Sequence, residues 1–516
     1  MPNTTAPLAE THQGAVAGVL VSTPHGAVDA FLGIPYGLLG PGRSRFEPAR
    51  APAPWPGTRD CSEAGPAVAQ NPNPYQEQAP ARPQDEVNGL NLNVWTPGAD
   101  SGRRATIVWI HGGANITGSN ADGLQDGARL AAFADAVVVS VNYRLGVFGF
   151  LWLDQSQHGC PIGNAAIHDL VAALEWVRRE IAAFGGDPDN VTIAGQSAGA
   201  ALVGTLLGVP AAAGLFHRAI MQSGTAERVA TPADGAALTR EIFRSLDLAE
   251  ADGARIFDRP TAEILAAQAD VVLAHQAEDV GLSIVFRPVI DGTLVPDVPL
   301  ASVRGGMSDA VDLLIGTNLD EASLFLLFDP PASSPGGLAE ALADEFRRDA
   351  GPGPSVDGFR GAVETDLGRP PSDTEALEAY LTDRSYRQPS NRLLDARAGA
   401  GGRTYSYIFT RPSPSMQGRL GACHGAELPF VFGTLDLAEA AFFSGPNPPS
   451  SLSERMMSSW AGFVWDGCPG PDRSWPAYQL PARTTRIWNE PPTVQGDPRR
   501  ALREFWATAL PDSALS

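Results

Sequence analysis

The sequence predicts an α/β fold whose centre is a large, mostly parallel β-sheet with helices on both faces. Two observations lead to this prediction: strand-like runs alternate with helical segments in the first part of the chain, and these strand-like runs are apolar throughout. Continuously apolar strands are typical of a parallel sheet that is buried on both faces. With 516 residues, 43% of them hydrophobic, the chain is long enough to bury such a sheet.

The first elements are two strands and a helix. Residues 105–113 (ATIVWIHGG) form a β-rich run that ends in glycines, and residues 136–146 (AVVVSVNYRLG) form a second, continuously apolar run. Residues 169–186 (DLVAALEWVRREIAAFGG) carry apolar side chains at helical spacing. Two glycines at the end of this segment, followed closely by a proline, provide the signal that ends a helix.

The next strand, residues 191–194 (VTIA), runs into a serine that lies between two glycines. Gly195 and Gly199 stand two residues before and two after Ser197, and a helical run of small apolar residues follows. A sharp turn from strand to helix exposes a serine hydroxyl and brings a helix N-terminus beside it. Such a turn leaves room only for small residues at the two flanking positions, so the glycines indicate a strained, exposed Ser197. The alternative is a glycine-rich turn with an incidental serine.

Residues from about 230 to 400 are richer in helix-like segments that are broken by prolines. They read as helices inserted over the sheet, and no clear linker separates them from the rest of the chain. We therefore expect a single domain over residues 1–516, with a helical insertion at approximately 230–400.

The chain has a formal net charge of −21 and contains no lysine. Nucleic acids and anionic membranes bind basic patches, so neither is expected as a partner. The first residues lack the segments of a secretory signal, and no run of about 18 apolar residues predicts a membrane span or anchor. The scattered cysteines, Cys61, Cys160, Cys423 and Cys468, form no CxxC pair. These features predict a cytoplasmic protein without a zinc site or a disulfide framework.

Three further stretches fit a nucleophilic serine. Residues 109–119 (WIHGGANITGS) place glycines after a strand, where backbone N–H groups stabilise an oxyanion. An apolar strand precedes Asp320 and Glu321, either of which could orient an imidazole, and His424 follows the strand-like run TYSYIF. This order of serine, acid and histidine is the one expected for the fold. The alternatives are an ordinary turn, an acidic helix cap and a packed or surface histidine.

Taken together, these motifs resemble the type-B carboxylesterases, the carboxylesterase–cholinesterase family of α/β-hydrolases, over nearly the whole chain. The resemblance implies the α/β-hydrolase fold with helical insertions covering the active site. It also implies a catalytic triad of Ser197, Glu321 and His424, and so selects Glu321 over Asp320. The blocks that carry it follow the family's order: FLGIPYG, LNLNVWTP, NYRLGVFGFL, GNAAIHDLVAALEWVRREIAAFGGDPDNVTIAGQSAGA, MQSG, FRPVIDG, GTNLDEASLF, CHGAELPFVFG and WPAY.

The resemblance further implies that the backbone N–H groups of Gly113, Ala114 and Ala198 bind the oxyanion. Ser223, in MQSG, matches a serine that lies behind the catalytic histidine, and a supporting role is expected for it. The implied reaction is hydrolysis of a carboxylic ester through an acyl-enzyme on Ser197, which requires no metal or cofactor. A small-molecule ester is the expected partner, and the sequence does not indicate an oligomeric state.

The chain departs from the family pattern at several positions. Asn115 stands where the family often has an aromatic residue, and Gln196 replaces the usual glutamate before the serine. Val68 and Gly89 match the positions of a disulfide in secreted members, so that bridge is absent. The loop between them has no tryptophan to hold a quaternary ammonium by a cation–π contact, and Tyr75 is a weak substitute.

Two other classes of function stay open. An amidase, a carbamate hydrolase or a lipase would use the same triad, and residue types alone do not separate these activities from esterase activity. A non-catalytic adhesion protein related to the cholinesterases is the second alternative. Such relatives commonly lose a member of the triad, whereas all three residues are present here.

Overall fold

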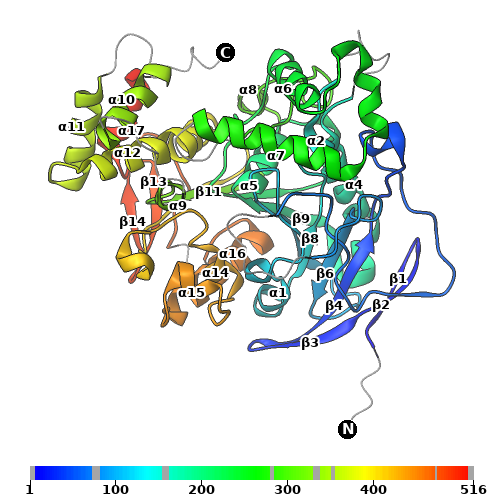
Figure 1. Cartoon of the computed structure of the whole chain (residues 1–516). Helices are drawn as coiled ribbons and strands as arrows, with labels where there is room; N and C mark the ends of the chain where they lie inside the picture. The colour runs from blue at the N-terminus through cyan, green and yellow to red at the C-terminus, as the bar shows by residue number, and fades with distance from the viewer. Residues whose placement is uncertain are drawn as a thin grey trace.

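The computed structural model describes residues 6–72, 82–153, 162–278, 284–328, 337–349, 355–470 and 474–509. An eleven-stranded sheet in the order β14-β13-β12-β11-β10-β9-β7-β8-β6-β4-β3 forms its centre, and β1, β2 and β5 form a small separate sheet (Figure 1). The strands are β1 (Leu8–Thr11), β2 (Gly14–Ala17), β3 (Val19–Thr23), β4 (Gly26–Pro35), β5 (Thr58–Asp60), β6 (Asn91–Thr96), β7 (Arg104–Ile110), β8 (Val137–Val141), β9 (Gly186–Gln196), β10 (Arg218–Gln222), β11 (Asp312–Asn318), β12 (Thr404–Phe409), β13 (Thr484–Trp488) and β14 (Thr493–Gly496).

The middle of the sheet is parallel. Neighbouring strands from β8 through β7, β9, β10, β11 and β12 to β13 pair in parallel, and antiparallel strands complete both ends. The carboxyl ends of parallel strands meet at one edge of a sheet, which is where ligands bind in open α/β sheets. The segments after β7, β9, β10, β11 and β12 contain, in that order, Gly113, Ser197, Ser223, Glu321 and His424. The predicted α/β-hydrolase fold is confirmed, and it brings these segments to a common edge.

Helices cover both faces of the sheet. Alternate side chains of β7 face the two helical layers. Val108 and Ile110 pack with α4 and α5, whereas Ile107 and Trp109 pack with α1, α14 and α16. The helices are α1 (Ala128–Ala134), α2 (Gly146–Phe150), α4 (Ala165–Glu180), α5 (Ala198–Leu206), α6 (Pro232–Ser245), α7 (Thr261–Glu278), α8 (Pro299–Arg304), α9 (Ser323–Phe328), α10 (Leu338–Asp349), α11 (Val356–Leu367), α12 (Asp373–Thr382), α13 (Gln388–Ala396), α14 (Leu428–Phe432), α15 (Ala440–Ser444), α16 (Ser450–Asp466) and α17 (Arg500–Ala509), with a π-helical turn η6 (Asp383–Arg387) between α12 and α13.

The predicted helix at residues 169–186 differs from α4 at both ends. Helix α4 begins at Ala165 and ends at Glu180, and a 3-10 turn continues to Phe184. Asp169 lies inside the helix, and its buried carboxylate pairs with Arg144 at 2.6 Å. The stop was predicted correctly, since Gly185 adopts φ 77°, a left-handed conformation that ends helices.

Residues of the predicted insertion contribute a third apolar cluster. Side chains of α10, α11 and α12 pack with Leu502 and Trp506 of the C-terminal helix α17, and these helices lie together at one end of the molecule (Figure 1). Strand β11 lies within the residue range of the predicted insertion and belongs to the central sheet. This continuous sheet supports the expectation of a single domain, which stays a prediction.

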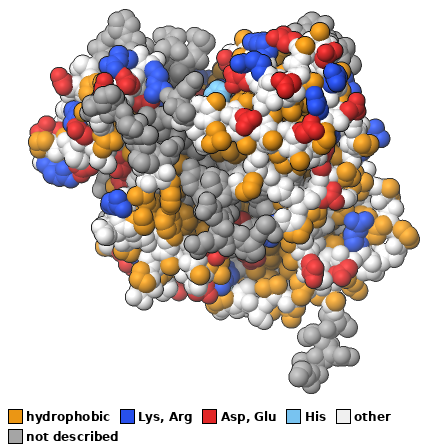
Figure 2. All heavy atoms as spheres, viewed as in Figure 1, with side chains coloured by type: hydrophobic (Ala, Val, Ile, Leu, Met, Phe, Trp, Pro, Cys, Tyr) orange, Lys and Arg blue, Asp and Glu red, His pale blue; other side chains and the backbone are white. Residues whose placement is uncertain are grey.

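The surface is mixed in charge. On the face shown in Figure 2, Arg side chains are interspersed with Asp and Glu over the described residues. Many arginines pair with a neighbouring carboxylate, as in the ion pairs Arg369–Glu375 and Arg500–Glu504. Within the described ranges, no helix is both long and apolar enough to cross a bilayer.

Candidate active site

Ser197 lies at the turn between β9 and α5. Its backbone adopts φ 58° and ψ −125°, which is unusual for a residue other than glycine. The turn is held because the Ser197 N–H donates to the carbonyl oxygen of Gln222 at 2.9 Å, while the Ser197 carbonyl accepts from Ala201 at 3.0 Å. Ser197 is 5% exposed. The predicted strand, turn and helix are therefore all present around the serine, but the expectation that Ser197 is exposed was wrong, because the surrounding segments bury it.

The two glycines around Ser197 leave room for neighbouring backbone. A Cβ at Gly199 would lie 2.0 Å from the carbonyl oxygen of Ile110, and a Cβ at Gly195 would lie 2.6 Å from the carbonyl carbon of Gly199. Both distances are far shorter than a carbon atom allows. The spacing of the glycines thus reflects the close approach of β7 to the start of α5.

The loop after β7 presents backbone N–H groups near the serine. Gly113, Ala114 and Asn115 have φ angles of 110°, 54° and 61°, and the Gly113 carbonyl accepts from the N–H groups of Ile116 and Thr117 at 3.0 Å each. Among the hydrogen bonds within the described ranges, none uses the N–H groups of Gly113, Ala114 or Ala198. The three N–H groups that the resemblance assigns to an oxyanion are therefore unpaired within the described ranges.

Two buried side chains support this loop. The His111 carbonyl accepts from the Tyr143 hydroxyl at 2.8 Å, and the His111 ring stacks on the Tyr143 ring. Burial lowers the pKa of His111 to about 4, so this imidazole stays neutral. Asn115 stands where the family often has an aromatic residue, and its side-chain amide nitrogen donates to the carbonyl of Phe286 at 2.9 Å.

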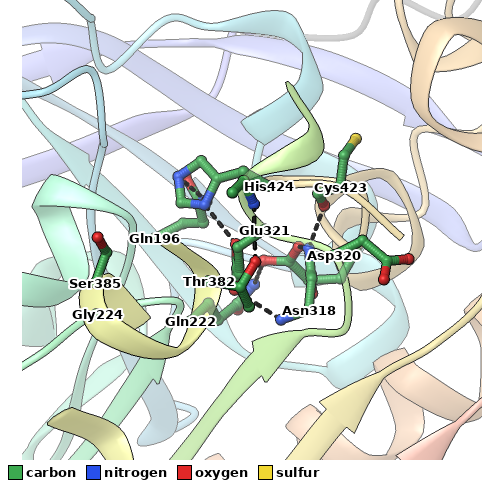
Figure 3. A network of polar contacts seen from close by, with 12 residues as sticks. Gln196, Gln222, Gly224, Asn318, Asp320, Glu321, Thr382, Ser385, Cys423 and His424 are labelled. Carbon is green, nitrogen blue, oxygen red and sulfur yellow. Dashed lines mark hydrogen bonds and ion pairs between the residues drawn. The ribbon is translucent and has the colours of Figure 1, made fainter. Parts of the chain in front are cut away.

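His424 and Glu321 are in direct contact (Figure 3). His424 Nδ1 lies 2.6 Å from Glu321 Oε2, and the other Glu321 oxygen accepts from the backbone N–H of Asn318 at 2.7 Å. Glu321 is fully buried, and His424 is 7% exposed. The rings of Phe325 and Tyr386 pack against the imidazole with centroids 5.3 and 4.9 Å away. The imidazole is thereby fixed on its Nδ1 side.

On the opposite side of the ring, His424 Nε2 contacts Gln196. The Gln196 amide nitrogen lies 3.0 Å from Nε2, as Figure 3 shows. Across the described residues, no hydrogen bond joins Ser197 Oγ to His424. The structure therefore brings Glu321, His424 and Gln196 into contact, and Ser197 follows Gln196 in the chain without a hydrogen bond to the imidazole in the described residues.

Asp320, the other candidate acid, has a different contact. Its carboxylate accepts from the Ala422 N–H at 2.8 Å, and its own N–H donates to the Ala422 carbonyl at 3.1 Å. Ser323 adds a second link, since its hydroxyl donates to the carbonyl of Leu420 at 2.5 Å. These bonds join the segment that carries Glu321 to the segment that carries His424, so Asp320 holds the two segments together rather than facing the imidazole.

A network of buried polar side chains next to Glu321 and His424 was not predicted from the sequence. Asn318 donates to the Cys423 carbonyl at 2.7 Å and to Glu427 at 2.6 Å, and Gln222 donates to the other Glu427 oxygen at 3.0 Å. Burial raises the pKa of Glu427, and the nearby Glu321 acts in the same direction. The only sequence signal was position: Glu427 comes three residues after His424.

The π-helical turn η6 also supports the site. It delivers Tyr386 to the imidazole and directs the Arg387 guanidinium to the carbonyls of Asn318 and Leu319 at 2.7 and 2.9 Å. Asp383, at the start of the turn, accepts from Arg387 at 3.1 Å and from the indole of Trp506 at 3.0 Å. Such π turns occur frequently at functional sites.

A pH-dependent effect on stability is expected from Glu378 of α12. Burial raises the pKa of the Glu378 carboxyl to about 8, and Asp320 and Glu375 act in the same direction. Unfolded glutamate titrates near pH 4.3, so between about pH 4 and pH 8 the folded protein binds the extra proton and stability falls as pH rises. Glu378→Gln removes this loss. We expect the Tm of Glu378→Gln to exceed that of the parent protein only slightly at about pH 5. The difference should reach its full size above about pH 8.

Glu375 on the same helix should show the opposite pH dependence. Its pKa is lowered to about 2, chiefly by hydrogen bonding to Arg369 and also by the N–H of Ser372. Glu375→Gln should therefore reduce Tm at neutral pH, with the loss vanishing as pH falls towards 2. Scanning calorimetry over pH measures both variants, and a Glu378→Gln effect that is equal at acidic and alkaline pH would contradict the prediction.

The remaining predicted positions are placed as follows. Ser223 follows β10 with φ 55°, its N–H donates to the Gly316 carbonyl at 2.8 Å, and its buried hydroxyl has no hydrogen-bond partner within the described ranges. Val68 and Gly89 lie side by side, because a Cβ at Gly89 would be 2.8 Å from Val68 Cα. Tyr75 and Cys160 lie outside the described residues.

Comparison with known proteins agrees with this architecture. The profile of the carboxylesterase family matches residues 5–506. The para-nitrobenzyl esterase of Bacillus subtilis (strain 168) is 32% identical over 94% of this chain and 96% of its own, and the phenmedipham hydrolase of Pseudarthrobacter oxydans is 31% identical over 92% and 93%. A crystal structure of a Geobacillus stearothermophilus carboxylesterase superposes with a TM-score of 0.82 at 34% identity, covering 97% of this chain and 99% of that one. The chain therefore belongs to the carboxylesterase family.

Proposed function

We propose that this carboxylesterase hydrolyses small-molecule carboxylic esters with Ser197 as nucleophile, His424 as general base and Glu321 as the acid that orients the base. The observation that carries the proposal is the 2.6 Å contact between buried Glu321 and His424 Nδ1, at the sheet edge where the strained turn presents Ser197. A carboxylate at Nδ1 fixes the imidazole tautomer so that Nε2 can accept a proton.

In the proposed reaction, Ser197 Oγ attacks the ester carbonyl while His424 Nε2 takes the hydroxyl proton. The tetrahedral oxyanion accepts hydrogen bonds from the N–H groups of Gly113, Ala114 and Ala198, whose backbone donors are unused within the described residues. His424 then protonates the leaving alcohol, and water activated by the same imidazole releases the acid from Ser197. The base and the N–H donors each contribute about a hundredfold or more to the rate. The reaction requires no metal or cofactor.

Labelling with a fluorophosphonate probe, followed by peptide mass mapping, tests this assignment. We expect one label on the peptide that contains Ser197, because the probe reacts only with a hydroxyl that a base activates. His424→Ala should abolish labelling, and Glu321→Gln should slow it. A label on another serine, or full labelling of the His424→Ala variant, would refute the proposed nucleophile and base.

The similarity to two differently named relatives makes the substrate class a direct question for experiment. A para-nitrophenyl ester and phenmedipham should both be assayed, since relatives at 32% and 31% identity are named para-nitrobenzyl esterase and phenmedipham hydrolase. We expect the ester to be the better substrate. A higher kcat/KM for phenmedipham than for the ester would favour phenmedipham hydrolysis as the activity of the same residues.

We also propose a cytoplasmic location for the enzyme. Cys61, Cys423 and Cys468 are free thiols. Burial raises the pKa of Cys61 to about 11 and also raises the pKa of Cys423, which suits thiols that stay protonated and unreactive. Fractionation of the source cells, followed by detection of the probe-labelled chain, tests this location.

A further inference from the structure

Gln196 occupies the place at which the proposed reaction needs Ser197. Its amide nitrogen lies 3.0 Å from His424 Nε2, and the side chain is 6% exposed. Its amide oxygen faces the loop after β7, because it would lie 3.2 Å from a Cβ built on Gly112. The side chain therefore extends from the imidazole to the loop that carries the oxyanion donors, next to Ser197.

The direction of the hydrogen bond between Gln196 and His424 follows from the other side of the ring. The Glu321 carboxylate accepts the hydrogen at His424 Nδ1, since the two atoms are 2.6 Å apart. A neutral imidazole with its hydrogen on Nδ1 has a lone pair on Nε2. The Gln196 amide N–H donates to this lone pair, which is the same lone pair that must receive the proton of Ser197.

We infer that Gln196 is a positioning residue that stabilises the unprotonated form of His424 at rest and releases Nε2 when Ser197 is activated. The inference rests on the proposed function, because it takes His424 to be the general base. An N–H donor at Nε2 opposes protonation of the imidazole, whereas a carboxylate at the same place would stabilise the imidazolium ion. Gln196 should therefore keep the base active to lower pH than a glutamate or an apolar side chain would.

Other charged and titratable groups lie on the segments that pack around His424, and substitutions at position 196 leave them in place. The acid and thiol groups lie on the segments after β11 and β12, and the cations and the phenol lie around η6. These groups are Glu321, Asp320, Cys423, Glu427, Arg387, Arg228 and Tyr386. A change in the pH dependence of a position-196 variant is thus attributable to the side chain at Nε2.

The test compares the parent enzyme with Gln196→Met and Gln196→Glu. Methionine keeps the approximate volume without an N–H donor, and glutamate replaces the amide with a carboxylate. The acid limb of kcat/KM for a para-nitrophenyl ester reports protonation of the base in the free enzyme. We expect its midpoint to rise by about 0.5 pH units in the methionine variant and by about 1 unit or more in the glutamate variant. The rate of fluorophosphonate labelling against pH should give the same order.

Gln479→Glu is the matched control, because Gln479 is exposed and the substitution adds the same charge away from the site. Its acid limb should coincide with that of the parent enzyme. Equal midpoints in all three position-196 enzymes, or a lower rate in the methionine variant with an unmoved midpoint, would overturn the inference. If the methionine variant does not fold, the nearly isosteric glutamate variant decides the question alone. A parent enzyme that hydrolyses no ester and takes no label at Ser197 would instead refute the proposed function.

Discussion

Replacing Ser197 with alanine should reduce kcat for a para-nitrophenyl ester by about ten-thousand-fold or more, to near the background rate. The reason is that Ser197 is the proposed nucleophile that forms the acyl-enzyme, whereas His424 and the proposed oxyanion donors would stay in place. Steady-state kinetics measures the loss, and an unchanged Tm would show that the fold is retained. A Ser197→Ala enzyme that kept most of its turnover would eliminate the acyl-enzyme mechanism.

Ser223 provides a matched comparison for Ser197. Both serines follow neighbouring parallel strands, and their φ angles are 55° and 58°. Ser223 is fully buried and its N–H is tied to the next strand, so we expect Ser223→Ala to lower kcat by about tenfold or less. Equal losses from the two substitutions would show that the site is sensitive to any change in these turns, and not to the nucleophile.

Substituting Gly199 with alanine should strongly lower the stability of the folded protein, because the added methyl group has no room. The added Cβ would lie 2.0 Å from the carbonyl oxygen of Ile110 and 2.6 Å from that of His111. Both atoms belong to backbone that is held at the end of the central strand β7, so neither can move without disturbing the sheet. We expect the free energy of unfolding to fall by about 3 kcal/mol or more, measured by urea unfolding.

Gly361 is the control for this substitution. It lies exposed inside helix α11, and a Cβ there meets nothing within 4 Å. Alanine at this position should stabilise the protein by about 0.5–1 kcal/mol, because glycine is unfavourable inside a helix. If Gly199→Ala and Gly361→Ala unfold at the same urea concentration, the close approach of β7 to the serine turn does not limit that position.

The parts of the structure that sequence could predict are those determined by near neighbours in the chain. Apolar runs and glycine positions located β7, β9 and α5, and the two glycines that flank Ser197 indicated the turn there. Helix α4 begins at Ala165, before the predicted start at Asp169, and the Asp169 carboxylate inside it is fixed by Arg144, a partner 25 residues away. Local spacing carries no information about such a partner.

The support of His424 could not be predicted for the same reason. The contact between Gln196 and His424 joins residues 228 apart in the chain, and that between Asn318 and Glu427 joins residues 109 apart. The sequence alone left Asp320 and Glu321 equivalent as candidate acids, since both follow the same strand. Their different roles depend on how the segment after β12 returns to the sheet edge, which side-chain packing decides and periodicity does not express.

The indole of Trp506 connects the tail of the chain to the centre of the molecule. Through Asp383 and Arg387 it reaches the carbonyls that precede Glu321, so α17 helps to hold the segment whose Glu321 contacts the imidazole of His424. A fusion partner or purification tag attached at the amino end leaves this connection untouched, whereas trimming of the carboxyl end into α17 removes it. We therefore expect loss of α17 to lower the turnover of the enzyme.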